Sequence, residues 1–171
     1  MRHMSYKIAG FFALIAVFCV IFVAYRDNAK QFQQMPETIE NFEAVNVEGG
    51  KTSFLAEKGK ATLVVLSASW CPACIAELPT LTKLHKEFSN NGLRILMISE
   101  DNNVKIASRF KKKHSMPWTV VHWNYDMMNK LGNPSVIPVS YLVDEDGDID
   151  YIEAGIIDEQ RMRHAIKALV K

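Results

Sequence analysis

The chain has 171 residues, a formal net charge of +1 and a charged fraction of 23%. This length suits one domain with a short appendage, because domains usually contain about 100–200 residues. The even charge balance, without a basic stripe, argues against a nucleic-acid partner. Three cysteines are too few for a scaffold held together by disulfide bonds.

The amino terminus contains an uncharged apolar stretch over residues 8–25, IAGFFALIAVFCVIFVAY. At about 1.5 Å per residue this stretch nearly crosses a hydrocarbon core, so it predicts a transmembrane helix. A cleaved signal peptide and a buried soluble helix are the alternatives, although the run is long for a signal and lacks a good small-residue cleavage site. We expect an anchor in residues 1–25, a linker in residues 26–36 and one domain in residues 37–171. Cys19, inside the apolar run, is interpreted as a small hydrophobic residue.

The domain begins with two short extended runs on either side of Gly49 and Gly50, a pattern that predicts a β-hairpin. Residues 61–69, ATLVVLSAS, form a continuous apolar run that is typical of a central strand buried on both faces. A helix is predicted from Pro72 until Asn90, Asn91 and Gly92 stop it. Its apolar stripe consists of Ile75, Leu78, Leu81, Leu84 and Phe88.

Strands and helices continue to alternate along the rest of the chain, which predicts an α/β sandwich. The basic run at residues 111–113 is interpreted as a solvated helix end that suits the helix dipole. A final helix is predicted from Asp158, with an inward face made of Met162, Ile166, Leu169 and Val170. The remaining predicted elements are strands at 93–99 and 118–121, helices at 103–113 and 126–132, and a second hairpin at 138–154.

Two cysteines, Cys71 and Cys74, lie in the stretch SASWCPACIAELP, where the central strand meets the helix. Unpaired backbone N–H groups and the positive end of the helix dipole stabilise a thiolate at this position, so the pKa of Cys71 should fall below the free value of about 8.5. Pro72 suits a first helical turn. The spacing places Cys74 on the same face, one turn deeper, where it can attack a mixed disulfide on Cys71.

Two other interpretations of the pair are a structural disulfide bridge and a metal site. A tetrahedral metal site requires further ligands, commonly a second cysteine pair or clustered histidines. The histidines that follow the apolar run lack ligand spacing; they are His85, His114, His122 and His164. The sequence therefore favours thiol–disulfide exchange and predicts no metal and no cofactor beyond the cysteine pair.

Glu77 follows Cys74 by three residues, near enough on a helix to accept its proton. The alternative is an exposed glutamate that is favoured by the helix dipole. Trp70, just before the pair, either shields one face of the sulfurs or fills the core. Pro138 is either a cis proline or an ordinary edge-strand proline.

These motifs resemble the thioredoxin superfamily and, within it, the membrane-anchored TlpA/ResA-like thiol–disulfide oxidoreductases. The likeness covers residues 36–171 and is based on LVVLSASWCPACIAELPTL and VIPVSYLVDEDGDI. It implies a thioredoxin-like sandwich with a central mixed sheet flanked by helices. It also implies that Cys71 attacks, that Cys74 resolves, that the Ile137-Pro138 peptide is cis and faces them, and that Glu77 assists proton transfer. The extra region at 118–132 matches the longer layout of this branch.

The chain also departs from its relatives at positions near the predicted site. Many relatives have threonine after the cis proline, where this chain has Val139. Val65 occupies the position at which thioredoxin keeps a buried aspartate, so Glu77 is expected to be the only carboxylate near the pair. Pro72 and Ala73 match neither thioredoxin nor the strong oxidants. The residues predicted to face the substrate are Trp70, Pro72, Ala73 and Ile137.

Ala73 supplies no donor or cation to the Cys71 thiolate, so we expect a fairly reducing protein. The resemblance implies a catalytic domain on the periplasmic side of the bacterial inner membrane. It implies clients such as apocytochrome c or copper-site proteins, and a membrane thiol transporter as electron donor. The alternatives are a general disulfide oxidase or isomerase, a Sco-like copper-carrying module and a peroxidase. A Sco-like module would have a C-x-x-x-C spacing. A peroxidase would need a resolving cysteine far from Cys71, and this sequence has none outside the apolar run.

Overall fold

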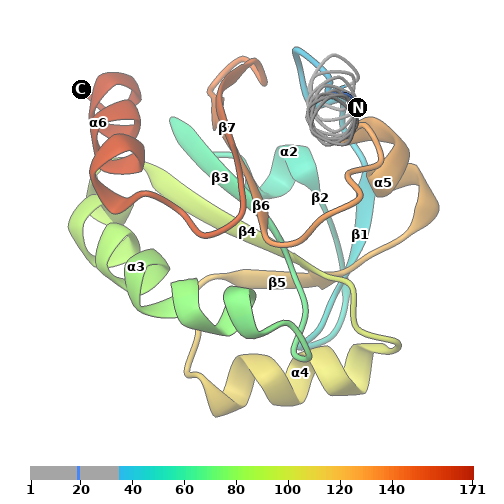
Figure 1. Cartoon of the computed structure of the whole chain (residues 1–171). Helices are drawn as coiled ribbons and strands as arrows, with labels where there is room; N and C mark the ends of the chain where they lie inside the picture. The colour runs from blue at the N-terminus through green and yellow to red at the C-terminus, as the bar shows by residue number, and fades with distance from the viewer. Residues whose placement is uncertain (1–18, 20–34) are drawn as a thin grey trace, which may run out of the picture. The chain divides into compact units, whose positions relative to one another are not determined.

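A seven-stranded mixed sheet forms the centre of the structure, a computed structural model that describes residue 19 and residues 35–171 (Figure 1). The strand order is β2-β1-β5-β4-β3-β6-β7. The strands are β1 (Glu43–Asn46), β2 (Lys51–Ser53), β3 (Ala61–Ser67), β4 (Leu93–Ser99), β5 (Thr119–His122), β6 (Val139–Asp144) and β7 (Ile149–Ala154). The helices are α2 (Phe54–Glu57), α3 (Pro72–Phe88), α4 (Val104–Lys113), α5 (Tyr125–Lys130) and α6 (Glu159–Leu169), with a 3₁₀ turn η1 (Ser89–Asn91).

The central strand β3 is buried at every position, as its continuous apolar sequence predicts. It pairs parallel with β4 and antiparallel with β6. Because β3 and β4 are parallel and in register from Ala61 to Ser67, both strands end at the same edge of the sheet. The loop that leaves β3 and the loop that leaves β4 therefore meet there, and this edge carries the cysteine pair.

Helices cover both faces of the sheet, in keeping with the predicted sandwich. Figure 1 shows α3 and α6 on one side, and α2 and α5 on the other. The core on the α3 side joins helix residues to odd-numbered positions of β3; its members include Leu63, Val65, Leu81, Phe110, Met162 and Ile166. On the other side Phe42 stacks against Phe54, and the hydroxyl of Tyr141 donates to the Leu131 carbonyl at 2.8 Å.

Strands β1 and β2 pair antiparallel on either side of a turn that contains Gly49 and Gly50. Both glycines have positive φ angles, of 114° and 85°, which residues with a Cβ rarely adopt. β1 also pairs with β5 and so joins this unit to the main sheet. The second predicted hairpin is present as the antiparallel pair β6 and β7.

Two predicted burial assignments are wrong, one for an apolar residue and one for a basic residue. Ile75 is 38% exposed and lies beside α4, so it does not belong to the apolar stripe that α3 packs on the sheet. Lys111 is only 8% exposed, so the run at 111–113 is not a uniformly solvated helix end. The Lys111 ammonium pairs with the carboxylate of Glu48, beyond the end of β1, and this partner makes its burial tolerable.

The predicted membrane anchor at residues 8–25 lies outside the described residues, apart from the exposed Cys19. Among the residues that the structure describes, no helix has the length and apolar character needed to cross a bilayer. The anchor, the linker and their boundaries therefore stay predictions.

Candidate active site at the start of α3

Cys71 is the N-cap residue of α3. Its backbone is extended, with φ −93° and ψ 111°, and its Sγ atom accepts a hydrogen bond from the Cys74 N–H at 3.2 Å. Pro72 follows in the first turn, where its missing N–H leaves no bond unmade. Cys71 and Cys74 form a disulfide with a Cα–Cα separation of 5.3 Å. The two cysteines are therefore close enough to be oxidised and reduced as a pair.

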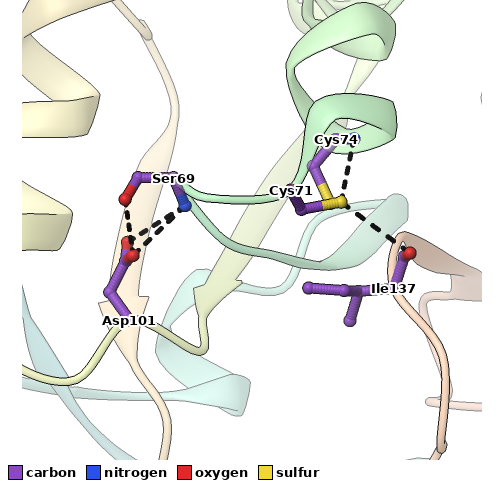
Figure 2. Close-up of a disulfide and its surroundings, with 5 residues drawn as sticks. All are labelled: Ser69, Cys71, Cys74, Asp101 and Ile137. Carbon is purple, nitrogen blue, oxygen red and sulfur yellow. Dashed lines mark hydrogen bonds between the residues drawn. A yellow bond between two sulfur atoms is a disulfide. The ribbon is translucent and has the colours of Figure 1, made fainter.

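The loop before β6 approaches the same sulfur from the opposite side (Figure 2). The Ile137-Pro138 peptide bond is cis, and the Ile137 carbonyl oxygen lies 3.8 Å from Cys71 Sγ. The Pro138 carbonyl accepts a hydrogen bond from the Gly155 N–H at 2.8 Å, which ties this loop to the end of β7. A reduced Cys71 thus lies between a donor from α3, which favours the thiolate, and a carbonyl, which favours the thiol.

Exposure differs strongly among the predicted site residues. Cys71 is 5% exposed and Cys74 is fully buried, whereas Trp70 is 63% exposed. The Trp70 side chain therefore does not fill the core, which was one of its two interpretations. Ala73 and Ile137 are partly buried and pack against the cysteine pair.

Glu77 is fully buried, and neither of its carboxylate oxygens has a hydrogen-bond partner within residues 35–171. Burial raises its pKa to about 8; the nearby Ile157 N–H offsets part of this rise, and the negative charge of Glu153 adds to it. The interpretation of Glu77 as an exposed glutamate is therefore wrong. The Glu153 carboxylate lies within interaction range of Glu77.

Asp101 is a second buried carboxylate near the pair, and the sequence analysis did not identify it. Its side chain accepts hydrogen bonds from the Ser69 hydroxyl at 2.6 Å and the Ser69 N–H at 3.2 Å (Figure 2). It also accepts one from the Ser99 hydroxyl at 2.8 Å. These bonds hold the loop between β3 and Cys71. The sequence signal was an aspartate two residues beyond β4, the parallel neighbour of the strand that leads to the cysteines.

The described part of the chain contains no cluster of three or more His, Cys, Asp or Glu side chains that could hold a metal ion. The Nε2 atom of His122 lies 2.8 Å from the Asp101 carbonyl oxygen, so this histidine is engaged in the loop network. The disulfide of Cys71 and Cys74 allows the site to exchange electrons through its two sulfurs, and Glu77, three residues after Cys74 on α3, is a group able to exchange a proton.

Sequence comparison relates the chain to known thiol enzymes. The profile of the Redoxin family matches residues 27–169. The thiol-disulfide oxidoreductase ResA of Bacillus cereus is 27% identical over 123 residues, which cover 70% of this chain and 69% of the relative. ResA of Oceanobacillus iheyensis is 25% identical over 105 residues, which cover 61% of this chain and 55% of the relative.

Structural comparison finds the same fold in solved proteins. A thioredoxin family thiol:disulfide interchange protein from Chlorobium tepidum TLS superposes with a TM-score of 0.71 at 22% identity, covering 80% of this chain and 97% of that one. StoA from Bacillus subtilis superposes with a TM-score of 0.62 at 22% identity, covering 76% of this chain and 98% of that one. The fold of residues 36–171 is therefore thioredoxin-like.

Proposed function

We propose that this chain, which belongs to the Redoxin family and is a thiol–disulfide oxidoreductase of the ResA type, reduces disulfides of client proteins outside the cytoplasm. Enzymes of this type use a redox-active cysteine pair and need no external cofactor. One observation carries the proposal: the N-cap of α3 is Cys71 itself, whose sulfur accepts the Cys74 N–H, while Cys74 is fully buried behind it.

The buried position of Cys74 assigns different roles to the two thiols. The Cys71 thiolate attacks one sulfur of a client disulfide, so a mixed disulfide forms and the first client sulfur leaves as a thiolate. Cys74 then loses its proton and attacks Cys71 Sγ. This step forms the Cys71–Cys74 disulfide, breaks the mixed disulfide and releases the second client sulfur. The client gains two electrons, and the enzyme pair loses two.

Glu77 is suited to exchange the proton of Cys74. Its pKa of about 8 lies near the ordinary thiol value of about 8.5, so a proton can pass between the two groups in either direction. The apolar surroundings that raise the pKa of Glu77 also keep bulk water away from the transfer. In the oxidised enzyme at neutral pH, Glu77 holds a proton that can be delivered to Cys74 when the disulfide is reduced.

The surroundings of Cys71 support a reducing rather than a strongly oxidising protein. A strong oxidant stabilises its reduced thiolate with additional donors or cations. Here Pro72 and Ala73 supply neither, and the Cys74 N–H is the donor to Cys71 Sγ among the described residues. The Ile137 carbonyl on the other side favours the thiol. We infer a low potential for the pair.

The clients that we propose are apocytochrome c or copper-site proteins, with a membrane thiol transporter as electron donor. The apolar segment at residues 8–25 would anchor the enzyme in the inner membrane, with the catalytic domain on the periplasmic side. Pro138 and Ile137 would face the extended client, together with Trp70, Pro72 and Ala73.

The decisive experiment replaces Cys74 with serine in the full chain and identifies the proteins trapped on Cys71 in the native membrane. The variant cannot resolve the mixed disulfide, so clients accumulate on Cys71. We expect haem-attachment or copper-site proteins, and their absence from the Cys71→Ser control. A broad catch of secreted proteins, or a measured potential near those of the strongest oxidants, would contradict the specialised reductant.

A further inference from the structure

A groove of about 250 Å³ runs between the first turns of α3 and the helix α4, beside the cysteine pair. On the α3 side it is lined by Ser69, two residues before Cys71, and by the exposed Ile75, four residues after it. On the α4 side, Ile106 and Phe110 provide apolar surface. We call this feature the α3–α4 groove.

The charged side chains that line the groove are all basic. Arg109 and Lys113 line it and are exposed, and neither makes an ion pair with any residue that the structure describes. They lie one helical turn apart, so their like charges repel. Lys111, from the same helix, differs because it is paired with Glu48 outside the groove. Two cations that lack a partner among the described residues thus face a groove whose described lining contains no acidic side chain.

The groove is connected to Cys71 through two of its lining residues, Ser69 and Ile75, which lie two residues before and four residues after that cysteine. A mixed disulfide requires the client sulfur to reach Cys71 Sγ, so the client chain on either side of that sulfur lies over the residues around Cys71. Two large apolar side chains on this surface, Trp70 and Ile75, are 63% and 38% exposed. Exposed apolar residues that gather around a reactive atom are typical of a contact surface. The client segment on one side of its reactive cysteine can therefore pass over Ile75 and enter the groove.

We propose that the α3–α4 groove binds the flank of the client next to its reactive cysteine, and that it selects clients with a carboxylate beside an apolar side chain at that place. The apolar side chain packs on Ile106 and Phe110, and the carboxylate pairs with Arg109 and Lys113. This inference rests on the proposed function, because it concerns the partner of the same thiol site. It assigns the two basic residues to specificity and leaves the sulfur chemistry unchanged.

The test uses synthetic peptides that each contain one mixed disulfide with glutathione and differ only in having Glu, Gln or Lys at each flanking position in turn. The full chain in detergent, in its reduced form, is mixed with each peptide, and the rate constant for reduction is measured at low and high salt. At the responsive position we expect Glu peptides to react about threefold to fivefold faster than Gln peptides, and Lys peptides more slowly. Salt should reduce the difference.

Charge reversal provides the matched variants. Arg109→Glu combined with Lys113→Glu should reverse the preference, so that Lys peptides react faster than Glu peptides. The milder pair Arg109→Gln and Lys113→Gln should abolish the preference, and it covers the case in which the reversed protein folds poorly. Lys112→Glu is the control, because Lys112 is exposed on the same helix but does not line the groove. It should leave the preference intact.

A small neutral disulfide, such as hydroxyethyl disulfide, separates this inference from the proposed function. A wild-type protein that fails to reduce it has no useful exchange activity, and the proposed function fails with the inference. A protein that reduces it but reacts equally with Glu and Lys peptides at every position keeps the proposed function and overturns the groove inference. Equal loss of preference in Lys112→Glu and the groove variants would also overturn it.

Discussion

Asp101 and Glu77 are two buried carboxylates in segments next to the cysteine pair, and their hydrogen bonding differs. Asp101 accepts hydrogen bonds from Ser69 and Ser99 and holds the loop that enters the site. Glu77 lies one to two turns into α3, and among the described residues neither of its oxygens has a hydrogen-bond partner. Burial raises the pKa of Glu77 to about 8, although the nearby Ile157 N–H offsets part of the rise. A buried carboxylate with partners acts as a structural tie, whereas one without them is available for proton exchange.

The difference follows from the place of each residue in the fold. Asp101 lies at the edge where the parallel strands β3 and β4 end. The backbone N–H and hydroxyl of Ser69 and the hydroxyl of Ser99 are available there to donate hydrogen bonds. Glu77 projects from the middle of a hydrogen-bonded helix, whose own N–H groups are occupied. The nearby Ile157 N–H lowers the pKa of Glu77 and the Glu153 carboxylate raises it, but burial outweighs both. Asp101 thus has bonded donors around it, whereas no described donor makes a full hydrogen bond to either oxygen of Glu77.

The largest expected effect is on the pH dependence of stability in the oxidised protein. The pKa of Glu77 rises from 4.5 to about 8 on folding, so the folded protein keeps a proton that the unfolded chain releases within this range. The contribution of Glu77 to the free energy of unfolding is largest below pH 4.5. Between pH 4.5 and about 8 it falls by about 1.4 kcal/mol per pH unit, and above pH 8 it no longer changes. Urea unfolding across this range measures it.

Glu77→Gln is the matched variant for that measurement, because glutamine does not titrate. We expect the part of the slope that Glu77 causes to disappear, while the contributions of Glu100 and His85 stay the same in both proteins, so the variant gains stability relative to the wild type as the pH rises toward 8. Equal slopes in the two proteins would show that Glu77 has an ordinary pKa, and the contrast with Asp101 would fail.

Asp101→Ala should lower the free energy of unfolding by about 2–4 kcal/mol, because it leaves the Ser69 N–H and two hydroxyls without their acceptor. Denaturant unfolding of the two oxidised proteins at one neutral pH is the measurement. A loss below about 0.5 kcal/mol would mean that the loop is held by other contacts.

Ser69→Ala removes one of these bonds, the 2.6 Å hydroxyl contact, and keeps the backbone N–H contact. We expect a loss of about 1 kcal/mol in the free energy of unfolding. In the Asp101→Ala background the same substitution should change stability much less, because the hydroxyl no longer has its acceptor. Full additivity in this double-mutant cycle would contradict the direct bond.

The smallest expected effect comes from Glu153→Gln. The negative charge of Glu153 is a minor cause of the raised pKa of Glu77, after burial, so its removal should lower that pKa slightly. NMR titration of the Glu77 carboxyl carbon in the two oxidised proteins measures the shift. A rise in the midpoint would contradict the assigned direction. Glu153 also pairs with Arg161, so Arg161→Gln, which keeps the Glu153 charge, is the companion variant.

Much of the fold could be predicted because its signals are local. The apolar run of β3, the helical spacing after Pro72 and the glycine turn at residues 49 and 50 each specify their element without distant contacts. The position of the cysteine pair followed from the junction of the first two elements. The cis peptide bond before Pro138 was predicted from the resemblance to the thioredoxin superfamily, because an Ile-Pro sequence alone does not specify a cis bond.

The missed features depend on contacts between distant segments. Asp101 acts through Ser69, 32 residues earlier, so its role depends on the register of β3 with β4. Lys111 was assigned to the surface because its basic run gave no sign of Glu48, 63 residues away. The sequence could not predict whether Glu77 is buried, for the same reason. Helix spacing shows which residues share a face of the helix but not which other elements cover that face.

The complete burial of Cys74 also determines which thiol of the reduced enzyme reacts with electrophiles and peroxides in solution. An electrophile or peroxide that approaches from solvent reaches Cys71 first, because the second sulfur is covered by the helix and its neighbours. Modification at that atom also deprives α3 of the side chain that caps its first turn. Chemical damage would therefore fall on one sulfur and loosen the helix that presents it, while the inner thiol stays intact for repair.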